Sequence, residues 1–332
     1  MELAVVREQP VLEVADLDVS FFTDRGELQV VKDVTFDIQA GETLALVGES
    51  GCGKSVSALA IMGLIEAPGR IVKGSIRLKG QDLIGLPEEE LQNVRGKRIG
   101  MIFQEPMTSL NPVFTNGDQI AEVLIHHLAM DPGKAREETI RLLDRVGIPL
   151  PAKCVDQYPH ELSGGMKQRV LIAMAIACKP DLLIADEPTT ALDVTIQAQI
   201  LRLLKKLQDN MGMALLLITH NLSVVAHYAR RVVVMYAGKI AEHAEVHPLF
   251  KCPLHPYTRT LLQAIPNPRR RGERLDSIQG TVPMPFDYPA GCRFCTRCSD
   301  VLGQCREKIP ILREKEPQHE VACWLYDGSQ DL

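Results

Sequence analysis

The stretch GESGCGKS, from Gly48 to Ser55, constrains this chain more than any other part of its sequence. It fits the pattern G-x-x-x-x-G-K-[ST] and lies between an apolar run, ETLALVG, and a segment with helical spacing, KSVSALAIMGLI. Glycines let successive backbone N–H groups curl around an anion, and a helix N-terminus adds partial positive charge. The sequence therefore predicts a phosphate-binding loop formed by Gly48, Glu49, Ser50, Gly51, Cys52, Gly53, Lys54 and Ser55.

The chemistry expected of this loop needs partners elsewhere in the chain. Lys54 is expected to reach the β- and γ-phosphates of a nucleotide, and the Ser55 hydroxyl to bind Mg²⁺. The apolar run LLIADE ends in two acids: Asp186 would hold the Mg²⁺ shell, and Glu187 would polarise the attacking water. Two acids that only cap a strand are the alternative, which the presence of the loop disfavours. Cys52 is interpreted as a neutral, replaceable residue of the loop.

Length and composition narrow the class of protein. The chain has 332 residues and a formal net charge of −5, which argues against nucleic acid as the main partner. No apolar run approaches the roughly 18 residues that cross a bilayer, and the first residues show no apolar signal core. We therefore expect a cytosolic chain, in which clustered cysteines bind metal more often than they form disulfides.

The order of the expected elements indicates an α/β fold. The runs VLEVADLDVSFF and QVVKDVTFDI predict two antiparallel strands, residues from about 105 to 179 are mostly helical, and strands then alternate with helices up to Gly238. This order predicts an antiparallel β subdomain, a mixed or parallel core sheet and an inserted helical subdomain. Residues 1–250 would form the nucleotide-binding domain. Residues 251–332, with a short helix, an irregular Pro-rich segment and a cysteine cluster, would form a C-terminal extension.

The stretch LSGGMKQR, from Leu162 to Arg169, points to a family. With the phosphate loop, IADEPTTALD and ITH, in that order, it resembles the ATP-binding subunits of ABC transporters over residues 11 to about 240. The resemblance implies head-to-tail pairs in which each ATP lies between the loop of one subunit and the signature of the other. The residues implied to contact ATP in trans are Ser163, Gly164, Gly165, Met166, Gln168 and, in the D-loop, Asp193. Plain helix N-caps are the alternative for Ser163 and Asp193.

The same resemblance implies further roles. Gln104 would sense the γ-phosphate, and His220 would hold the water geometry beside Glu187, so that Glu187, His220 and Gln104 form the catalytic set. Phe21, with Phe22 as the alternative, would stack on adenine. A solvated glutamine, a structural histidine and core aromatics are the corresponding structural interpretations. ATP and Mg²⁺ are the implied ligands of the site.

Three stretches, among them QEPMTSLNPVFTNGDQI, resemble the peptide-uptake branch, as do HPYTRTLL and the cysteine-bearing tail. The branch comprises dipeptide, oligopeptide and nickel permeases, and the dipeptide ATP-binding subunits are the most similar. The branch implies a second, paralogous ATPase subunit, two integral membrane permease subunits and, indirectly, an extracytoplasmic peptide-binding protein. The chain would be peripheral on the cytoplasmic face of the inner membrane, with residues from about 104 to 160 receiving the membrane subunits. A nickel or small-solute importer, a non-transport ABC ATPase and an iron–sulfur redox protein are the alternatives.

Five cysteines lie near the end of the chain. CRFCTRC has the C-x₂-C-x₂-C spacing of the first three cluster ligands of bacterial ferredoxins. In ferredoxins the fourth cysteine comes three residues later and is followed by proline, whereas Cys305 comes later than that and has no proline after it. The tail of the peptide permeases instead has C-x₅-C-x₆-C-x₁₇-C, which Cys292, Cys298, Cys305 and Cys323 match. In that family the pattern is associated with a 4Fe–4S cluster; structural zinc is the alternative. Cys295 would then be an extra thiol.

Overall fold

A computed structural model describes residues 9–104, 109–190, 192–265 and 280–326 of the chain. The chain divides into two compact units. Unit 1 comprises Met1–Leu12, Ile38–Glu42 and Leu78–Ile218, and unit 2 comprises Glu13–Asp37, Thr43–Arg77 and Thr219–Leu332. Within the described ranges, no helix combines the length and the apolar character needed to cross a bilayer.

Unit 1 is built on three parallel strands. β6 (Ile99–Ile102) pairs with β7 (Leu182–Asp186), and β7 pairs with β8 (Ala214–Thr219). Every residue of β7 and β8 is buried, so these strands are continuous apolar runs without alternation. Because parallel strands present their carboxyl ends at one edge, the register places Asp186, the last residue of β7, opposite Ile218 of β8.

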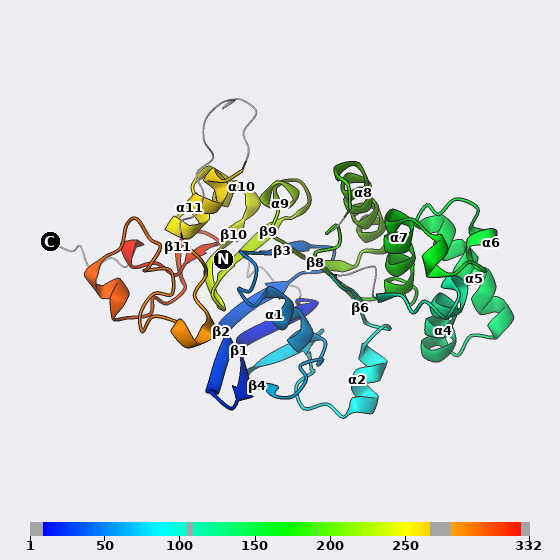
Figure 1. The fold of residues 1–332 in the computed structure, drawn as a ribbon, viewed down its shortest axis with the longest axis horizontal. Coiled ribbons are helices and arrows are strands. Elements are labelled where there is room, and N and C mark those ends of the chain that lie inside the picture. The colour runs from blue at the N-terminus through cyan, green and yellow to red at the C-terminus, as the bar shows by residue number, and fades with distance from the viewer. Residues whose placement is uncertain (1–8, 105–108, 191, 266–279, 327–332) are drawn as a thin grey trace, which may run out of the picture. The chain divides into compact units, whose positions relative to one another are not determined.

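Helices form most of the remainder of unit 1. They are α2 (Glu88–Val94), α4 (Asn116–Leu128), α5 (Pro132–Arg145), α6 (Pro151–Cys154), α7 (Gly164–Ala175) and α8 (Val194–Met211). α4, α5 and α7 pack against one another, as Figure 1 shows in green. α4 begins at a capping box in which the Thr115 side chain accepts from the Asp118 amide, and Ile120 and Leu124 on its apolar face are fully buried. The short α2 was not predicted.

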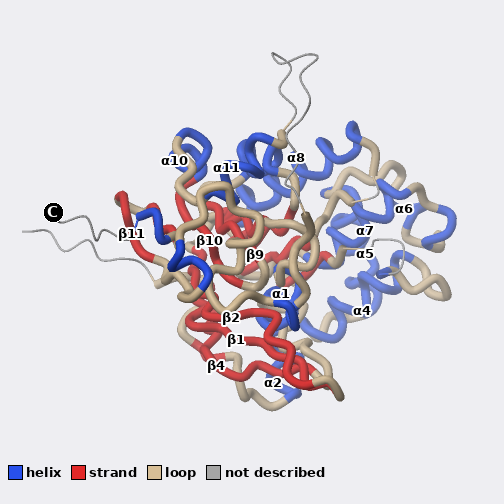
Figure 2. Tube along the Cα trace, turned by 60° about the vertical axis from the view of Figure 1, so that its left-hand side comes forward, coloured by secondary structure: helices blue, strands red, loops and turns tan. Residues whose placement is uncertain are grey.

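One sheet of unit 2 contains the two antiparallel strands that the sequence predicted and one further strand. β1 (Leu12–Thr23) and β2 (Gly26–Ile38) are joined by a two-residue turn, and β4 (Gly69–Leu78) pairs with β1 on its other side. Figure 2 shows these strands side by side in red. β5 (Gln81–Asp82) follows in unit 1. The sequence predicted β1 and β2 closely, but β4 starts earlier than the predicted GSIRLKG.

The other strands of unit 2 bring a segment near the beginning of the chain together with its end. β3 (Thr43–Val47) runs parallel to β9 (Arg231–Tyr236), and β9 pairs antiparallel with β10 (Lys239–Glu245). β10 pairs with β12 (His319–Val321), which pairs with β11 (Arg313–Glu316). The expectation of little regular structure after Gly238 missed β10, β11 and β12. Residues 266–279 of the predicted irregular segment lie outside the described residues.

Short helices and an aromatic cluster complete unit 2. The helices are α1 (Lys54–Ile61), α9 (Leu222–Tyr228), α10 (Val246–Lys251) and α11 (Pro256–Gln263). The ring of Tyr236 lies 4.7 Å from that of Tyr257 in α11 and 5.1 Å from that of Phe294. All three rings are almost completely buried, so α11 and the cysteine-rich segment share one core with β9.

Candidate functional site

The phosphate loop of unit 2 joins β3 to α1, as predicted. Gly53 caps α1 with φ of 99°, a conformation that L side chains rarely adopt. Gly48 is required for a different reason: a Cβ there would lie 2.2 Å from the Met235 carbonyl oxygen. The first turn of α1 has no acidic residue to oppose an anion. The loop thus has the backbone geometry of a phosphate cradle.

Lys54 lies folded back onto this loop. Its Nζ donates to the Gly48 carbonyl oxygen at 2.9 Å and to the Glu49 carbonyl oxygen at 3.0 Å, and the side chain is buried. Cys52 Sγ lies 3.7 Å from the same Nζ. Burial raises the pKa of the Cys52 thiol, which is consistent with its interpretation as a neutral residue of the loop.

Near the carboxyl end of β7, in unit 1, the Glu187 side chain is hydrogen-bonded to two other polar side chains. Asp186 is buried at the strand end, and Glu187 follows it with φ of 45°. Glu187 Oε2 accepts from Gln104 Nε2 at 3.3 Å and from Thr190 Oγ1 at 2.8 Å. A non-glycine residue in the left-handed region costs free energy, which the surrounding contacts must offset. The structure thus brings Gln104 and Glu187 together, and Thr190 is a partner that the sequence analysis did not name.

Three residues that were predicted as nucleotide contacts, His220, Phe21 and its alternative Phe22, lie in unit 2. His220 is exposed and directly follows β8. Phe21 is half-buried, and its ring lies so close to Gly69 that an added Cβ would approach it at 2.6 Å. Phe22 is 37% exposed, with the Arg70 guanidinium 4.0 Å above its ring centre. Both aromatics remain candidates for stacking, with Phe22 the more accessible.

The signature and D-loop residues begin two helices of unit 1. Ser163 is the N-cap of α7, and its side chain accepts from the Met166 amide at 3.4 Å; Gly164 and Gly165 form the first turn. Asp193 caps α8 by accepting from the Ile196 amide at 2.9 Å. The N-cap interpretation of both residues is thus observed. Gln168 is completely buried, so its side chain does not reach a surface that a partner subunit could contact.

The tail cysteines that were predicted to hold a cluster are neighbours in the structure. The Cys292 amide donates to the Cys305 carbonyl oxygen at 2.8 Å, and all nine cysteines of the chain are free thiols. Burial, with the nearby thiols of Cys305 and Cys323, raises the pKa of Cys292 to about 12. In the described part of the chain, no group of three or more His, Cys, Asp or Glu residues is placed to hold a metal ion.

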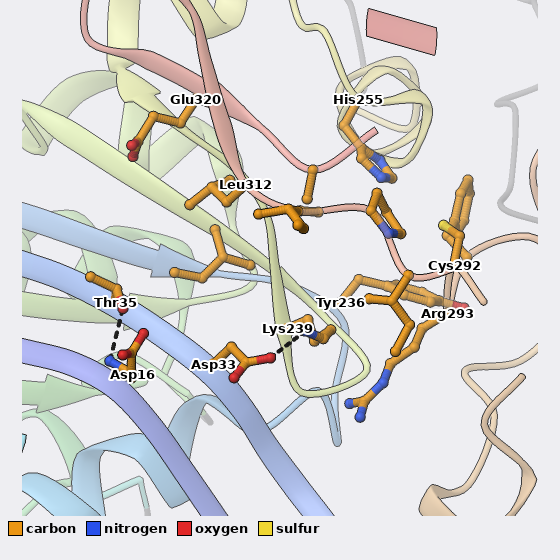
Figure 3. A pocket seen from close by; sticks show the side chains of 17 residues that line it. Asp16, Asp33, Thr35, Tyr236, Lys239, His255, Cys292, Arg293, Leu312 and Glu320 are labelled. Atoms are coloured by element: carbon orange, nitrogen blue, oxygen red, sulfur yellow. Dashed lines mark hydrogen bonds and ion pairs between the residues drawn. The ribbon is translucent and has the colours of Figure 1, made fainter. Parts of the chain in front are cut away.

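A cavity of about 580 Å³ opens in unit 2 (Figure 3). Figure 3 shows the ion pair of Asp33 and Lys239, 2.9 Å long, on one side of it and Arg293, Tyr236 and Cys292 on another. Of the predicted site residues, only Cys292 lines it. The residues that line the cavity include none of the phosphate loop.

Two residues far along the chain contact the phosphate loop and were not predicted from the sequence. Arg297, between two of the tail cysteines, forms a two-pronged ion pair with Glu49, and the Tyr257 hydroxyl accepts from the Glu49 amide at 2.9 Å. Both lie more than 200 positions from Glu49. No local spacing signals such contacts, because only the folded sheet brings these segments together.

Comparisons with known proteins agree with this geometry. A family model described as ABC transporter matches residues 31–190, and one described as Oligopeptide/dipeptide transporter, C-terminal region, matches residues 241–305. The dimeric structure of the ATP-binding cassette MJ0796 in a post-hydrolysis state, bound to ADP and Pi, has a TM-score of 0.64 and 26% identity. It covers 71% of this chain and 98% of its own. The fold is thus that of an ABC ATPase cassette, with mixed sheets and helices.

Relatives along the whole chain define the family. The dipeptide transport ATP-binding protein DppD of Bacillus subtilis is 49% identical over 320 residues, which cover 96% of this chain and 96% of that protein. DppD of Escherichia coli is 50% identical over 301 residues, 91% of this chain and 92% of that protein. This chain belongs to the family of ABC transporter ATP-binding proteins, which are ATPases.

Proposed function

We propose that this chain hydrolyses ATP to power the uptake of dipeptides or short oligopeptides through an ABC importer. The observation that carries the proposal is identity of about half of all residues to dipeptide transport ATP-binding proteins along more than 90% of the chain. That likeness includes the tail, where residues 241–305 match the C-terminal region of oligopeptide and dipeptide transporters. We also propose that residues 1–250 form the nucleotide-binding domain, with a helical subdomain at about 105–179, and that residues 251–332 form the C-terminal extension.

The phosphate loop and the end of β7 supply the chemistry. The loop amides and Lys54 would hold the phosphates, while the Ser55 hydroxyl and Asp186 would ligate Mg²⁺, which usually takes only one or two protein ligands beside phosphates and water. Glu187 would accept a proton from the attacking water, with Gln104 and Thr190 fixing its carboxylate. His220 and an aromatic at Phe21 or Phe22 complete the proposed set.

The second half of each site would come from another subunit. Ser163, Gly164, Gly165 and Met166 form the start of α7, where amides and the helix dipole can bind a γ-phosphate. The dimeric cassette MJ0796 with bound ADP and Pi supports the pairing of two such subunits. Asp193 would contact the partner from the start of α8, whereas Gln168 would support α7 from within. We propose a paralogous ATPase subunit as the partner.

The membrane subunits would bind the helical part of unit 1. Large apolar side chains are exposed there: Val113 and Phe114 before α4 are 70% and 52% exposed, and Leu150 before α6 is 73% exposed. Exposed apolar side chains gathered in one region favour a protein partner. The chain would thus be peripheral at the cytoplasmic face of the inner membrane, with the extracytoplasmic peptide-binding protein acting through the permease subunits.

The iron–sulfur cluster stays a proposal that rests on cysteine spacing and on the family resemblance. Cys292, Cys298, Cys305 and Cys323 would be the ligands and zinc the alternative metal, with the cofactor stapling the tail. Cys298→Ser is then expected to lose bound iron, measured by metal analysis of the purified chain, while Cys295→Ser keeps it. Equal loss in both variants, or a chain purified anaerobically without iron or zinc, would refute this ligand set.

Co-purification from native membranes tests the proposed function. A tagged chain is expected to bring down two integral membrane subunits and a second ATPase subunit. Phe114→Ser should weaken that association, because it removes exposed apolar area, whereas Ile311→Ser, 66% exposed in the tail, serves as the control. Recovery of only soluble or nucleic-acid partners would contradict a role in transport.

A further inference from the structure

The side chain of Glu49, the second residue of the phosphate loop, is held by the cysteine-rich tail. Arg297 Nη1 donates to Glu49 Oε2 at 2.7 Å, and Nη2 donates to Oε1 at 3.1 Å. The Arg297 side chain is 4% exposed and that of Glu49 is 28% exposed, so the guanidinium is almost completely removed from water. A two-pronged pair of this kind fixes geometry as well as charge.

The backbone of Glu49 is held as well. Its amide donates to the Tyr257 hydroxyl at 2.9 Å, and its carbonyl oxygen accepts from Lys54 Nζ at 3.0 Å. The Tyr236 hydroxyl lies 3.3 Å from Arg297 Nη1 and links the tail to β9. Every polar group of Glu49 is therefore bound before a nucleotide arrives. Arg297 and Tyr257, which contact Glu49, and Tyr236, which contacts Arg297, all come from the last 100 residues of the chain.

Because Glu49 and a nucleotide are both negatively charged, the contact of Glu49 with Arg297 matters for nucleotide binding. Glu49 places a carboxylate on a loop proposed to bind a triphosphate, and like charges a few ångströms apart repel each other strongly near a partly buried site. Arg297 offsets that carboxylate and directs it toward the tail. Burial by itself would lower the pKa of the Arg297 guanidinium, but the hydrogen bonds with Glu49 and Tyr236 outweigh it and hold that pKa above its usual range, so the group is always charged.

We propose that Arg297 is a positioning residue for ATP binding: it neutralises Glu49 and, with Tyr257, fixes the phosphate loop in the conformation that receives the nucleotide. The inference rests on the proposed assignment of Gly48–Ser55 as the phosphate loop. It gives the cysteine-rich segment a direct connection to the ATP site. A tail that packed only for stability would have no such effect on nucleotide affinity.

Nucleotide affinity and turnover of the purified chain test this inference. Arg297→Gln should raise the Kd and the KM for ATP about tenfold, because it leaves an uncompensated carboxylate on the loop, and should change kcat less than twofold. Glu49→Gln combined with Arg297→Gln should recover most of the lost affinity. Arg297→Lys, which keeps the charge but not the fork, should lie between these values. Arg306→Gln, an exposed arginine of the same tail, is the matched control.

The possible results of these measurements distinguish failure of the proposed role of Arg297 from failure of the phosphate-loop assignment. Lys54→Ala with unchanged ATP affinity would refute the loop assignment itself. Lys54→Ala without ATP binding, beside a folded Arg297→Gln with wild-type affinity, would refute only the role of Arg297. A double variant whose loss equals the product of the two single losses would refute charge compensation. Should Arg297→Gln not fold, Arg297→Lys takes its place, and an unchanged Kd there counts against the inference.

Discussion

Single carboxylates carry the proposed chemistry of this chain, and Glu187 is the foremost of them. Its backbone has φ of 45°, and its Oε2 accepts hydrogen bonds from both Gln104 and Thr190. These contacts orient the other oxygen's lone pairs rather than neutralise the group, because both partners are uncharged donors. These contacts are consistent with the proposed role of Glu187 as a base, and the cost of its backbone conformation is consistent with a functional position.

We expect Glu187→Gln to retain ATP binding and to lose turnover by about 100-fold or more, the usual contribution of a general base. The amide keeps the shape of the side chain but cannot accept a proton. Steady-state ATPase assays and binding of a fluorescent ATP analogue measure the two effects. Glu88→Gln, on the exposed first turn of α2, is the control. Near-wild-type turnover in Glu187→Gln would remove Glu187 from the mechanism.

A buried histidine makes the stability of unit 2 depend on pH. His255 is 3% exposed, and its Nδ1 accepts from the Tyr257 amide at the start of α11. Burial lowers the pKa of His255 from 6.5 to about 4, although the nearby Glu242 carboxylate opposes the shift and Arg259 adds to it. Below pH 6.5 the unfolded chain therefore takes up a proton that the folded chain refuses. Stability is full above that pH and falls as the pH decreases toward 4.

This linkage predicts a loss of about 2 kcal/mol from His255 alone between pH 7.5 and pH 5. His255→Asn keeps an acceptor for the Tyr257 amide but does not titrate. Urea unfolding at the two pH values should show a smaller loss in His255→Asn than in the wild type. His227→Asn, exposed on α9, should behave as the wild type. Equal losses in all three proteins would show that His255 is not the titrating group.

At the scale of elements, Glu242 connects three segments that the sequence does not link. It lies on β10, is completely buried, and accepts from His319 Nε2 of β12 at 2.7 Å. It also accepts from the amides of Leu254 and His255 before α11, at 2.7 Å and 3.0 Å. One carboxylate thus joins the cassette strand, the last helix and the tail strand.

Removing this carboxylate should loosen the tail. Glu242→Leu leaves a buried histidine and two amides without their acceptor, and such a break costs about 3–5 kcal/mol of unfolding free energy. Glu320→Gln, on the same tail strand and paired with His243 at 3.1 Å at a partly exposed site, should cost less than about 1 kcal/mol. Chemical unfolding gives both values, and limited proteolysis shows whether the tail is released first. Equal, small costs would mean that the tail does not depend on Glu242.

Some elements of the fold were predicted from the sequence and others were missed, and the difference has physical reasons. The phosphate loop, β1, β3, β7, β8 and α8 were predicted well, because their pattern follows from local backbone demands and from burial on both faces. β10 and β12 were missed, since short strands that carry buried Glu242 and His319 do not read as apolar runs. Gln168 was placed at the partner's ATP, yet it points into the core, because family motifs record order and not orientation.

At the scale of the whole molecule, the tail belongs to the same compact unit as the phosphate loop. Strand pairing through β12, the aromatic cluster and the Arg297–Glu49 pair all act within unit 2. Glu187 and the proposed signature residues lie in unit 1. An ATPase cycle that couples the two would depend on the tail only through the phosphate loop, which is why the tail variants should change ATP affinity more than the chemical step.

Peptide uptake tests the central claim most directly. In cells that lack this chain, accumulation of a radiolabelled dipeptide is measured after wild-type chain or Glu187→Gln is supplied at equal levels. Wild-type chain should restore energy-dependent uptake, and Glu187→Gln should not, although it still associates with the membrane subunits. Uptake that survives loss of the chain, or that Glu187→Gln restores in full, would contradict the account.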